Sequence, residues 1–142
     1  MLVALDTYRT WARLLSQMRH SAWIVDRVHL STRAYQIRHH GRDYAFASLE
    51  EQLRPLGFRI ALLTRAQGSL ASARAARLKV SGMPDQDDDL QVFIDEQDLF
   101  RRLAAESTLP WREFDIPDDN VDRAPGRGAD WLEQSGGLSM DD

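Results

Sequence analysis

The sequence contains no cysteine, which excludes a disulfide framework and any metal site built from thiolates. Its apolar runs reach only about five residues, whereas a membrane-spanning helix needs roughly 20. The first residues, MLVALDTYRTW, lack the basic segment and the continuous apolar segment of a secretory signal peptide. These absences predict a cytoplasmic protein with no membrane partner.

Lysine is also scarce: of the 18 basic residues only Lys79 is a lysine, and the rest are arginines. One explanation is a GC-rich genome. The other is the binding of oxyanions, because the planar guanidinium group matches the geometry of phosphate. The pI near 5.5 argues against a broad surface for nucleic acid, so we expect no nucleic-acid partner.

The hydrophobic pattern alternates between helices and short strands. The run AWIV at 22–25 does not alternate in polarity, as is typical of strands buried on both faces. FRIALLT at 58–64 and WREFDI at 111–116 predict two more strands. This order predicts an α/β fold, a three-layer parallel sheet with flanking helices, in a single domain over residues 1–135. We expect helices at 2–19, 44–54, 69–80, 90–107 and about 118–134, a loop at 81–89, a helix break at 124–128 and a disordered tail at 136–142. The stretch 28–42 is polar and basic, with Gly41 as a break, and predicts neither a helix nor a strand.

Polar and basic residues follow two of these predicted strands. Asp26 and Arg27 come directly after the first strand, and Arg65 comes directly after the second. In parallel sheets, ligands bind outside the carboxyl ends of the strands. The sequence therefore predicts a basic binding site at this edge of the sheet.

The segment DRVHLSTRAYQ, residues 26–36, resembles the thymidylate kinases, in which a strand ends in Asp-Arg and leads into a Leu-Ser-Thr-x-Ala-Tyr-Gln run. Further features are similar in the same order. The helix with ALDTYRTWARLL resembles the one that presents an arginine to the nucleobase, and SLASARAARLKV resembles the mobile lid, here about residues 65–90. The last helix, strand and helix also follow the family order, so the resemblance covers about residues 2–135.

The resemblance implies the fold of a P-loop nucleoside monophosphate kinase and transfer of phosphate from ATP to a nucleoside monophosphate such as dTMP. Mg²⁺ and ATP would be the cofactors. Phosphoryl transfer depends mostly on positioning and charge stabilisation. By resemblance, the catalytic residues are Asp26, Arg74 and Arg77, the substrate-binding residues are Arg9, Arg27, Ser31, Tyr35 and Gln36, and Arg65, Arg74 and Arg77 bind the phosphates of ATP.

One family motif is missing from the sequence. Nucleotide kinases of this kind carry a glycine-rich phosphate loop, GxxxxGK[ST], on the strand between those expected at 22–26 and 58–64. No such motif occurs here, so we expect no phosphoryl transfer by this chain alone. The two strands must pair directly, or a homodimer or a partner chain must fill the groove between them. A truncated product, half of a split gene and an incorrect reading frame remain open, as does a non-catalytic subunit that binds a partner at this groove.

Several of these candidate residues also have a purely structural interpretation. Asp26 and Arg27 fit an ion pair at a strand end as well as a phosphate site. Arg74 and Arg77 share a helix face, which fits a solvated basic surface equally well. Arg9 fits either a helix surface or a pocket.

Metal binding is not indicated by the sequence. His39 and His40 are adjacent and point apart on any regular element, and no acid lies beside them or beside His29 at ligand spacing. The acidic run 85–89 lacks the alternating ligands, central glycine and closing glutamate of a calcium loop. We therefore predict no metal-ligating residues.

Overall fold

The computed structural model describes residues 2–18, 23–81, 89–116 and 124–135. Most of these residues lie in helices, and none of the described helices is long and apolar enough to cross a membrane. The elements in chain order are α1 (Leu2–Gln17), α2 (His29–His40), α3 (Ala47–Leu53), η1 (Arg54–Leu56), β1 (Ile60–Thr64), α4 (Gln67–Ser81), α5 (Leu90–Glu106), β2 (Trp111–Asp115) and α6 (Ala124–Gln134).

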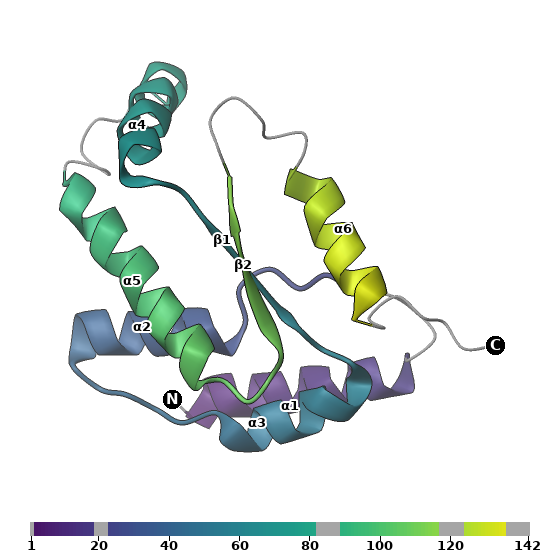
Figure 1. The fold of residues 1–142 in the computed structure, drawn as a ribbon. Helices are drawn as coiled ribbons and strands as arrows, with labels where there is room; N and C mark the ends of the chain where they lie inside the picture. Colours follow the sequence, from purple (N-terminus) through teal and green to yellow (C-terminus); the bar gives the residue numbers. More distant parts are fainter. Residues whose placement is uncertain (1, 19–22, 82–88, 117–123, 136–142) are drawn as a thin grey trace.

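The two strands form a parallel pair, in register from Ile60 opposite Trp111 to Thr64 opposite Asp115. Helices α4 and α5 make the crossover between them, as a parallel connection requires. In Figure 1, α5 and α6 lie on opposite sides of the strands, and α4 lies beyond their carboxyl ends. Helices α1 and α3 lie at the opposite end, below the start of β1.

The main core lies at the amino ends of the strands, where α1 and α3 meet the loop before β2. Its buried members are Ala12, Phe46, Leu49, Leu53 and Leu109. Helix α1 contributes Ala12 together with Leu5 and Tyr8, which recur at helical spacing and pack against this cluster. A cavity here would be costly, since truncating a buried leucine to alanine removes about 2–5 kcal/mol of stability.

The expected three-layer parallel sheet is wrong. The described residues contain two strands, and the predicted strand at 22–25 is not among them: residues 23–28 have no regular structure. Trp23 is exposed, Ile24 is 96% exposed and Val25 is only partly buried, so the described part of this apolar run is not buried on both faces as expected. The physical reason is that a strand requires a neighbouring strand to satisfy its backbone, and none of the described residues forms a strand beside this segment.

Two further elements differ from expectation. The polar and basic stretch 28–42, for which the sequence predicted neither a helix nor a strand, forms helix α2 over most of its length. Helix α2 ends where Gly41 adopts the left-handed conformation with φ of 60°. The sequence APGRG does not interrupt the last helix but forms its first turn, because α6 begins at Ala124. Proline is tolerated in a first turn, whose N–H groups have no intrahelical acceptor. The predicted start at 118, most of the loop at 81–89 and the tail at 136–142 lie outside the described residues.

Candidate functional site

The carboxyl ends of β1 and β2 meet at one edge. The sequence predicted that Asp26 and Arg27 also lie at such an edge, after a strand at 22–25, and this prediction is wrong, because residues 23–28 form no strand. The backbone N–H of Ile116 donates to the carbonyl of Thr64 at 2.9 Å, which closes the ladder at this end. The side-chain amide of Gln97, on α5, holds the main chain of Arg65 from both sides: it accepts from the Arg65 N–H at 2.7 Å and donates to its carbonyl at 3.1 Å. Arg65 is therefore fixed at the end of β1.

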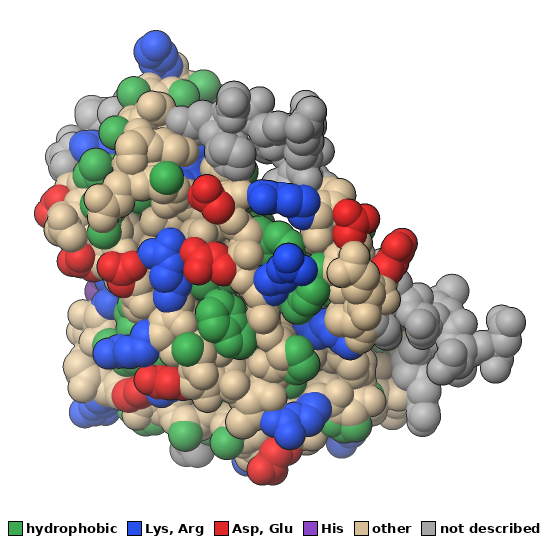
Figure 2. Space-filling model, in the orientation of Figure 1, with side chains coloured by type: hydrophobic (Ala, Val, Ile, Leu, Met, Phe, Trp, Pro, Cys, Tyr) green, Lys and Arg blue, Asp and Glu red, His purple; other side chains and the backbone are tan. Residues whose placement is uncertain are grey.

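An ion-pair network covers the α5 face of the strands. Glu113 accepts from the hydroxyl of Thr64 at 2.7 Å and from Arg101, whose Nε lies 2.9 Å away. Hydrogen bonds from Arg101 and then from Thr64 hold the pKa of Glu113 below its ordinary value. Figure 2 shows acidic and basic side chains interspersed on the face in view, so this face has no extended field of one sign.

Asp26 and Arg27 lie in the irregular segment directly before α2. Both are exposed, and Arg27 has a backbone φ of 53°, the only positive φ of a non-glycine residue in the described ranges. Val28 is the N-cap of α2, but no side chain caps the helix and its first turn contains no acid. The first N–H groups of α2 therefore receive no hydrogen bond acceptor from the side chain of the N-cap residue. The exposed Arg27 lies directly before this end of the helix.

Helix α2 distributes the other candidate residues over two faces. Ser31 and Tyr35 are one turn apart and share a face, with Ser31 partly buried and Tyr35 exposed. The Tyr35 ring lies against the His39 ring, with 4.5 Å between centroids. Gln36 is about 100° around the helix from Tyr35, so its side chain leaves from a different face.

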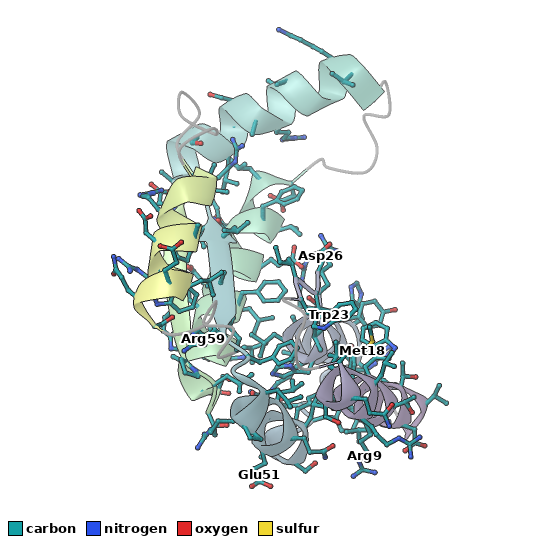
Figure 3. The ribbon with its side chains drawn as sticks, turned by 90° about the vertical axis from the view of Figure 1, so that its right-hand side faces the viewer. Arg9, Met18, Trp23, Asp26, Glu51 and Arg59 are labelled. Atoms are coloured by element: carbon teal, nitrogen blue, oxygen red, sulfur yellow. The ribbon has the colours of Figure 1, made fainter. Side chains whose placement is uncertain are left out.

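The arginines expected at the site are not all together. Arg9 lies on α1, on the opposite side of that helix from Asp26, and points away from it (Figure 3). Its guanidinium lies 3.8 Å from Asp6, one turn earlier on the same helix. Arg74 is partly buried on α4, beyond the carboxyl ends of the strands, and the side chain of Arg77 lies outside the described residues. The structure thus groups Asp26, Arg27 and Ser31 around the start of α2, and it does not bring Arg9 to them.

A buried polar network was not predicted from the sequence. Its centre is the carboxylate of Glu50, on α3. Oε1 lies 2.8 Å from His29 Nε2 and accepts from the Ser107 hydroxyl at 2.8 Å. Oε2 accepts from the Thr108 N–H at 2.6 Å and from its hydroxyl at 2.8 Å. One carboxylate therefore joins α2, α3 and the loop before β2.

The protonation states in this network follow from burial and hydrogen bonding. Burial lowers the pKa of His29, although the hydrogen bond and the charge of Glu50 act against that shift. Burial acts to raise the pKa of Glu50, but the donors from Thr108, Ser107 and His29 together outweigh it, so the pKa lies below its ordinary value. A neutral imidazole thus donates from Nε2 to an ionised carboxylate, because a carboxylate can only accept. Both side chains are almost completely buried, so the pair supports the fold rather than meeting a substrate.

No signal in the sequence could have paired these residues, which are 21 and 58 positions apart along the chain. No group of three or more potential metal ligands occurs among the described residues. Comparison of the chain with protein-family models, with curated proteins and with solved structures gives no match.

Proposed function

We propose that the chain binds a nucleoside monophosphate, such as dTMP, with its phosphate at the start of α2. The observation that carries this proposal is the conformation of Arg27. A left-handed backbone costs a non-glycine residue about 1–2 kcal/mol, and such outliers concentrate at binding and catalytic sites. Here the outlier presents an exposed arginine directly before an uncapped helix.

The chemistry of this helix end suits a phosphate. The first N–H groups of a helix point along its axis, and the helix dipole adds a partial positive charge. Arg27 supplies a full positive charge and a forked donor, and Ser31 supplies a hydroxyl in the first turn. In this proposal Tyr35, about 6 Å further along the helix, offers an exposed ring to the nucleoside.

The same residues do not hold ATP. The sequence has no glycine-rich loop to surround the triphosphate, and no described residue replaces its lysine. Mg²⁺ is usually held by one or two carboxylates together with substrate phosphates. Asp26 offers a single exposed carboxylate, which fits Mg²⁺ only when a nucleotide supplies the remaining oxygens. We therefore assign the chain the acceptor side of a kinase-like site and no phosphoryl transfer in isolation.

A second candidate function is to bind an extended segment of a partner chain along β1. The backbone N–H of Ile60 donates to the carbonyl of Pro110, and the carbonyl of Thr64 accepts from the N–H of Ile116. The backbone groups of alternate residues of β1 therefore point toward β2. The backbone groups of Ala61 and Leu63 consequently face the other edge, where no described strand pairs with them. Leu63 is 60% exposed. An open strand edge of this kind is a template for strand addition.

Isothermal titration of the full chain with dTMP in the presence of Mg²⁺ tests the first candidate. We expect saturable binding that Arg27→Ala weakens by about 10- to 100-fold, because one charge-assisted hydrogen-bond donor to the phosphate is lost. Arg42→Ala is the matched control, since it removes an equal charge from an exposed position beyond the other end of α2. Absence of heat from a folded sample, or equal effects of the two substitutions, would refute the proposal.

A further inference from the structure

The first turn of α2 is held against the interior by two of its side chains. His29, the first residue of the helix, is 4% exposed, and its Nε2 lies 2.8 Å from the carboxylate of Glu50 on α3. Three residues later, the hydroxyl of Thr32 lies 2.5 Å from the hydroxyl of Tyr8 on α1. The turn that begins the candidate phosphate site is therefore positioned by contacts with α3 and α1.

The left-handed backbone of Arg27 lies two residues before the first of these contacts. A strained conformation persists only where the surrounding structure holds it. The Arg27 side chain is exposed and does not supply that support, and the first buried side chain after it is that of His29. On the amino side, the indole N–H of Trp23 donates to the carbonyl of Met18 at 3.3 Å. The contact of His29 with Glu50 therefore helps to fix the position from which Arg27 would reach a phosphate.

The second ring nitrogen of His29 has no partner. Nδ1 is buried, and no described residue forms a hydrogen bond with it. In the neutral ring, Nε2 donates to Glu50 and Nδ1 is an acceptor. Protonation places a hydrogen on Nδ1, which then becomes a buried donor without an acceptor. Because an unsatisfied buried donor is costly, protonation favours a state in which the ring has left the interior.

The charged groups around His29 act in opposite directions. Glu50 favours a protonated ring, and Arg33, one turn later on α2, disfavours it. Arg33 is itself paired with Asp43, before α3, and with Glu106, at the end of α5. The loop before β2 contributes hydroxyl and N–H donors to Glu50 rather than charges. Burial outweighs the attraction of Glu50, so the pKa of His29 lies below its ordinary value.

We propose that His29 is a positioning residue of the nucleotide site, whose buried contact with Glu50 holds the start of α2 and whose protonation releases it. This inference rests on the proposed function, because it takes the start of α2 as the phosphate site. Release of the ring lets Arg27 leave its left-handed conformation and separates it from the first N–H groups of α2. The chain should therefore hold a nucleoside monophosphate at neutral pH and release it in acid.

Isothermal titration with dTMP and Mg²⁺ at pH 7.5 and at pH 5.5 tests the effect on binding. The matched variant is His29→Gln, whose side-chain amide can donate to Glu50 as Nε2 does but does not take up a proton. The phosphate of dTMP also titrates in this range, with a pKa of about 6, and this change is common to both proteins. The affinity of the unaltered chain should fall several-fold more than that of His29→Gln. The limit is about tenfold, because a released imidazole of ordinary pKa 6.5 has about ten protonated rings for each neutral one at pH 5.5.

Equal losses of affinity in the two proteins overturn the proposal. The control is His40→Gln, because His40 is exposed at the other end of α2 and its ring lies 5.7 Å from that of Tyr35, the residue proposed to meet the nucleoside. This variant should keep the full loss of affinity in acid. A loss that disappears with His40→Gln and persists with His29→Gln also overturns the proposal.

A measurement without ligand separates this inference from the proposed function. In NMR spectra of the free chain from pH 7.5 to pH 5.5, the Cα chemical shifts of residues 29–32 should move from helical toward unstructured values with the midpoint of the His29 ring. His29→Gln should abolish this change, and the shift of the fully buried Leu103 on α5 should stay constant, since the rest of the fold persists. If residues 29–32 stay helical while the ring titrates, the proposal is overturned even if dTMP binds. If they change but dTMP binds at neither pH, the proposed function is refuted together with the role of His29 in nucleotide binding, and the release of the turn is confirmed.

Discussion

Replacement of Glu50 by alanine is expected to destabilise the fold severely. The carboxylate accepts four hydrogen bonds in the interior, two of them from N–H groups that cannot turn toward another acceptor, those of His29 and Thr108. A buried donor that loses its acceptor costs about 1–3 kcal/mol, and the N–H groups of the neutral His29 imidazole and of Thr108 both lose theirs. We therefore expect a loss of about 3 kcal/mol, which is large against a total stability of about 5–15 kcal/mol.

The measurement is urea unfolding at pH 7, followed by circular dichroism at a fixed protein concentration. Glu51→Ala provides the control, because Glu51 lies on the same helix but is exposed and points away from the rest of the molecule (Figure 3). Its substitution should change the free energy of unfolding by no more than about 0.5 kcal/mol. If Glu50→Ala costs less than about 1 kcal/mol, the hydrogen bonds do not stabilise the fold as reasoned here.

Other substitutions and conditions give separate checks. In the folded chain the pKa of His29 is lowered from 6.5, so below this pH the unfolded chain binds more protons than the folded chain. The free energy of unfolding should therefore fall from pH 7 to pH 5. A urea midpoint that is the same at both pH values would contradict this prediction. Arg27→Gly relieves the strain of the left-handed backbone, about 1–2 kcal/mol, and the greater entropy of the unfolded glycine chain offsets about 0.4–1 kcal/mol of that gain. Thermal unfolding should therefore show a stability equal to or higher than that of the unaltered chain, whereas titration should show that dTMP binding is lost. Gly41→Ala places a β-carbon at φ of 60° and should cost about 1 kcal/mol in urea, although no atom lies within 4 Å to clash with it. Amide exchange by NMR should be faster at Ala61 than at Leu62, since only the latter faces β2, and equal protection would show that the edge of β1 is paired.

Elements with a strong local pattern were predictable from the sequence. Helix α5 and strands β1 and β2 lie where the apolar periodicity placed them, within a few residues at each end. Helix α2 was missed because polar and basic residues fill most of its positions, and its inward contacts are largely polar. Arg33, for example, binds Asp43 and also Glu106 on α5, with its Nη2 2.6 Å from the Glu106 carboxylate.

The errors concern interactions between distant segments. An apolar run such as 22–25 has the composition of a strand, but a strand exists only beside another backbone, and composition does not supply that neighbour. The prediction of the candidate site was limited in the same way, because it was correct only for residues that are close in the sequence. Asp26, Arg27 and Ser31 are close in the sequence and remain close in space, whereas Arg9 lies on another helix whose orientation the sequence did not specify.

The open edge of β1 also affects how this protein behaves in concentrated solution. The strand IALLT is short, apolar and uncharged, which is the composition of segments that nucleate cross-β aggregates. Arg59 precedes it and Arg65 follows it, so two like copies stacked in register would bring arginines together at both ends. Charged residues in these positions act as gatekeepers that keep an exposed strand soluble. Replacing both arginines with uncharged residues would therefore convert a surface suited to a specific partner into one that joins identical chains into fibrils.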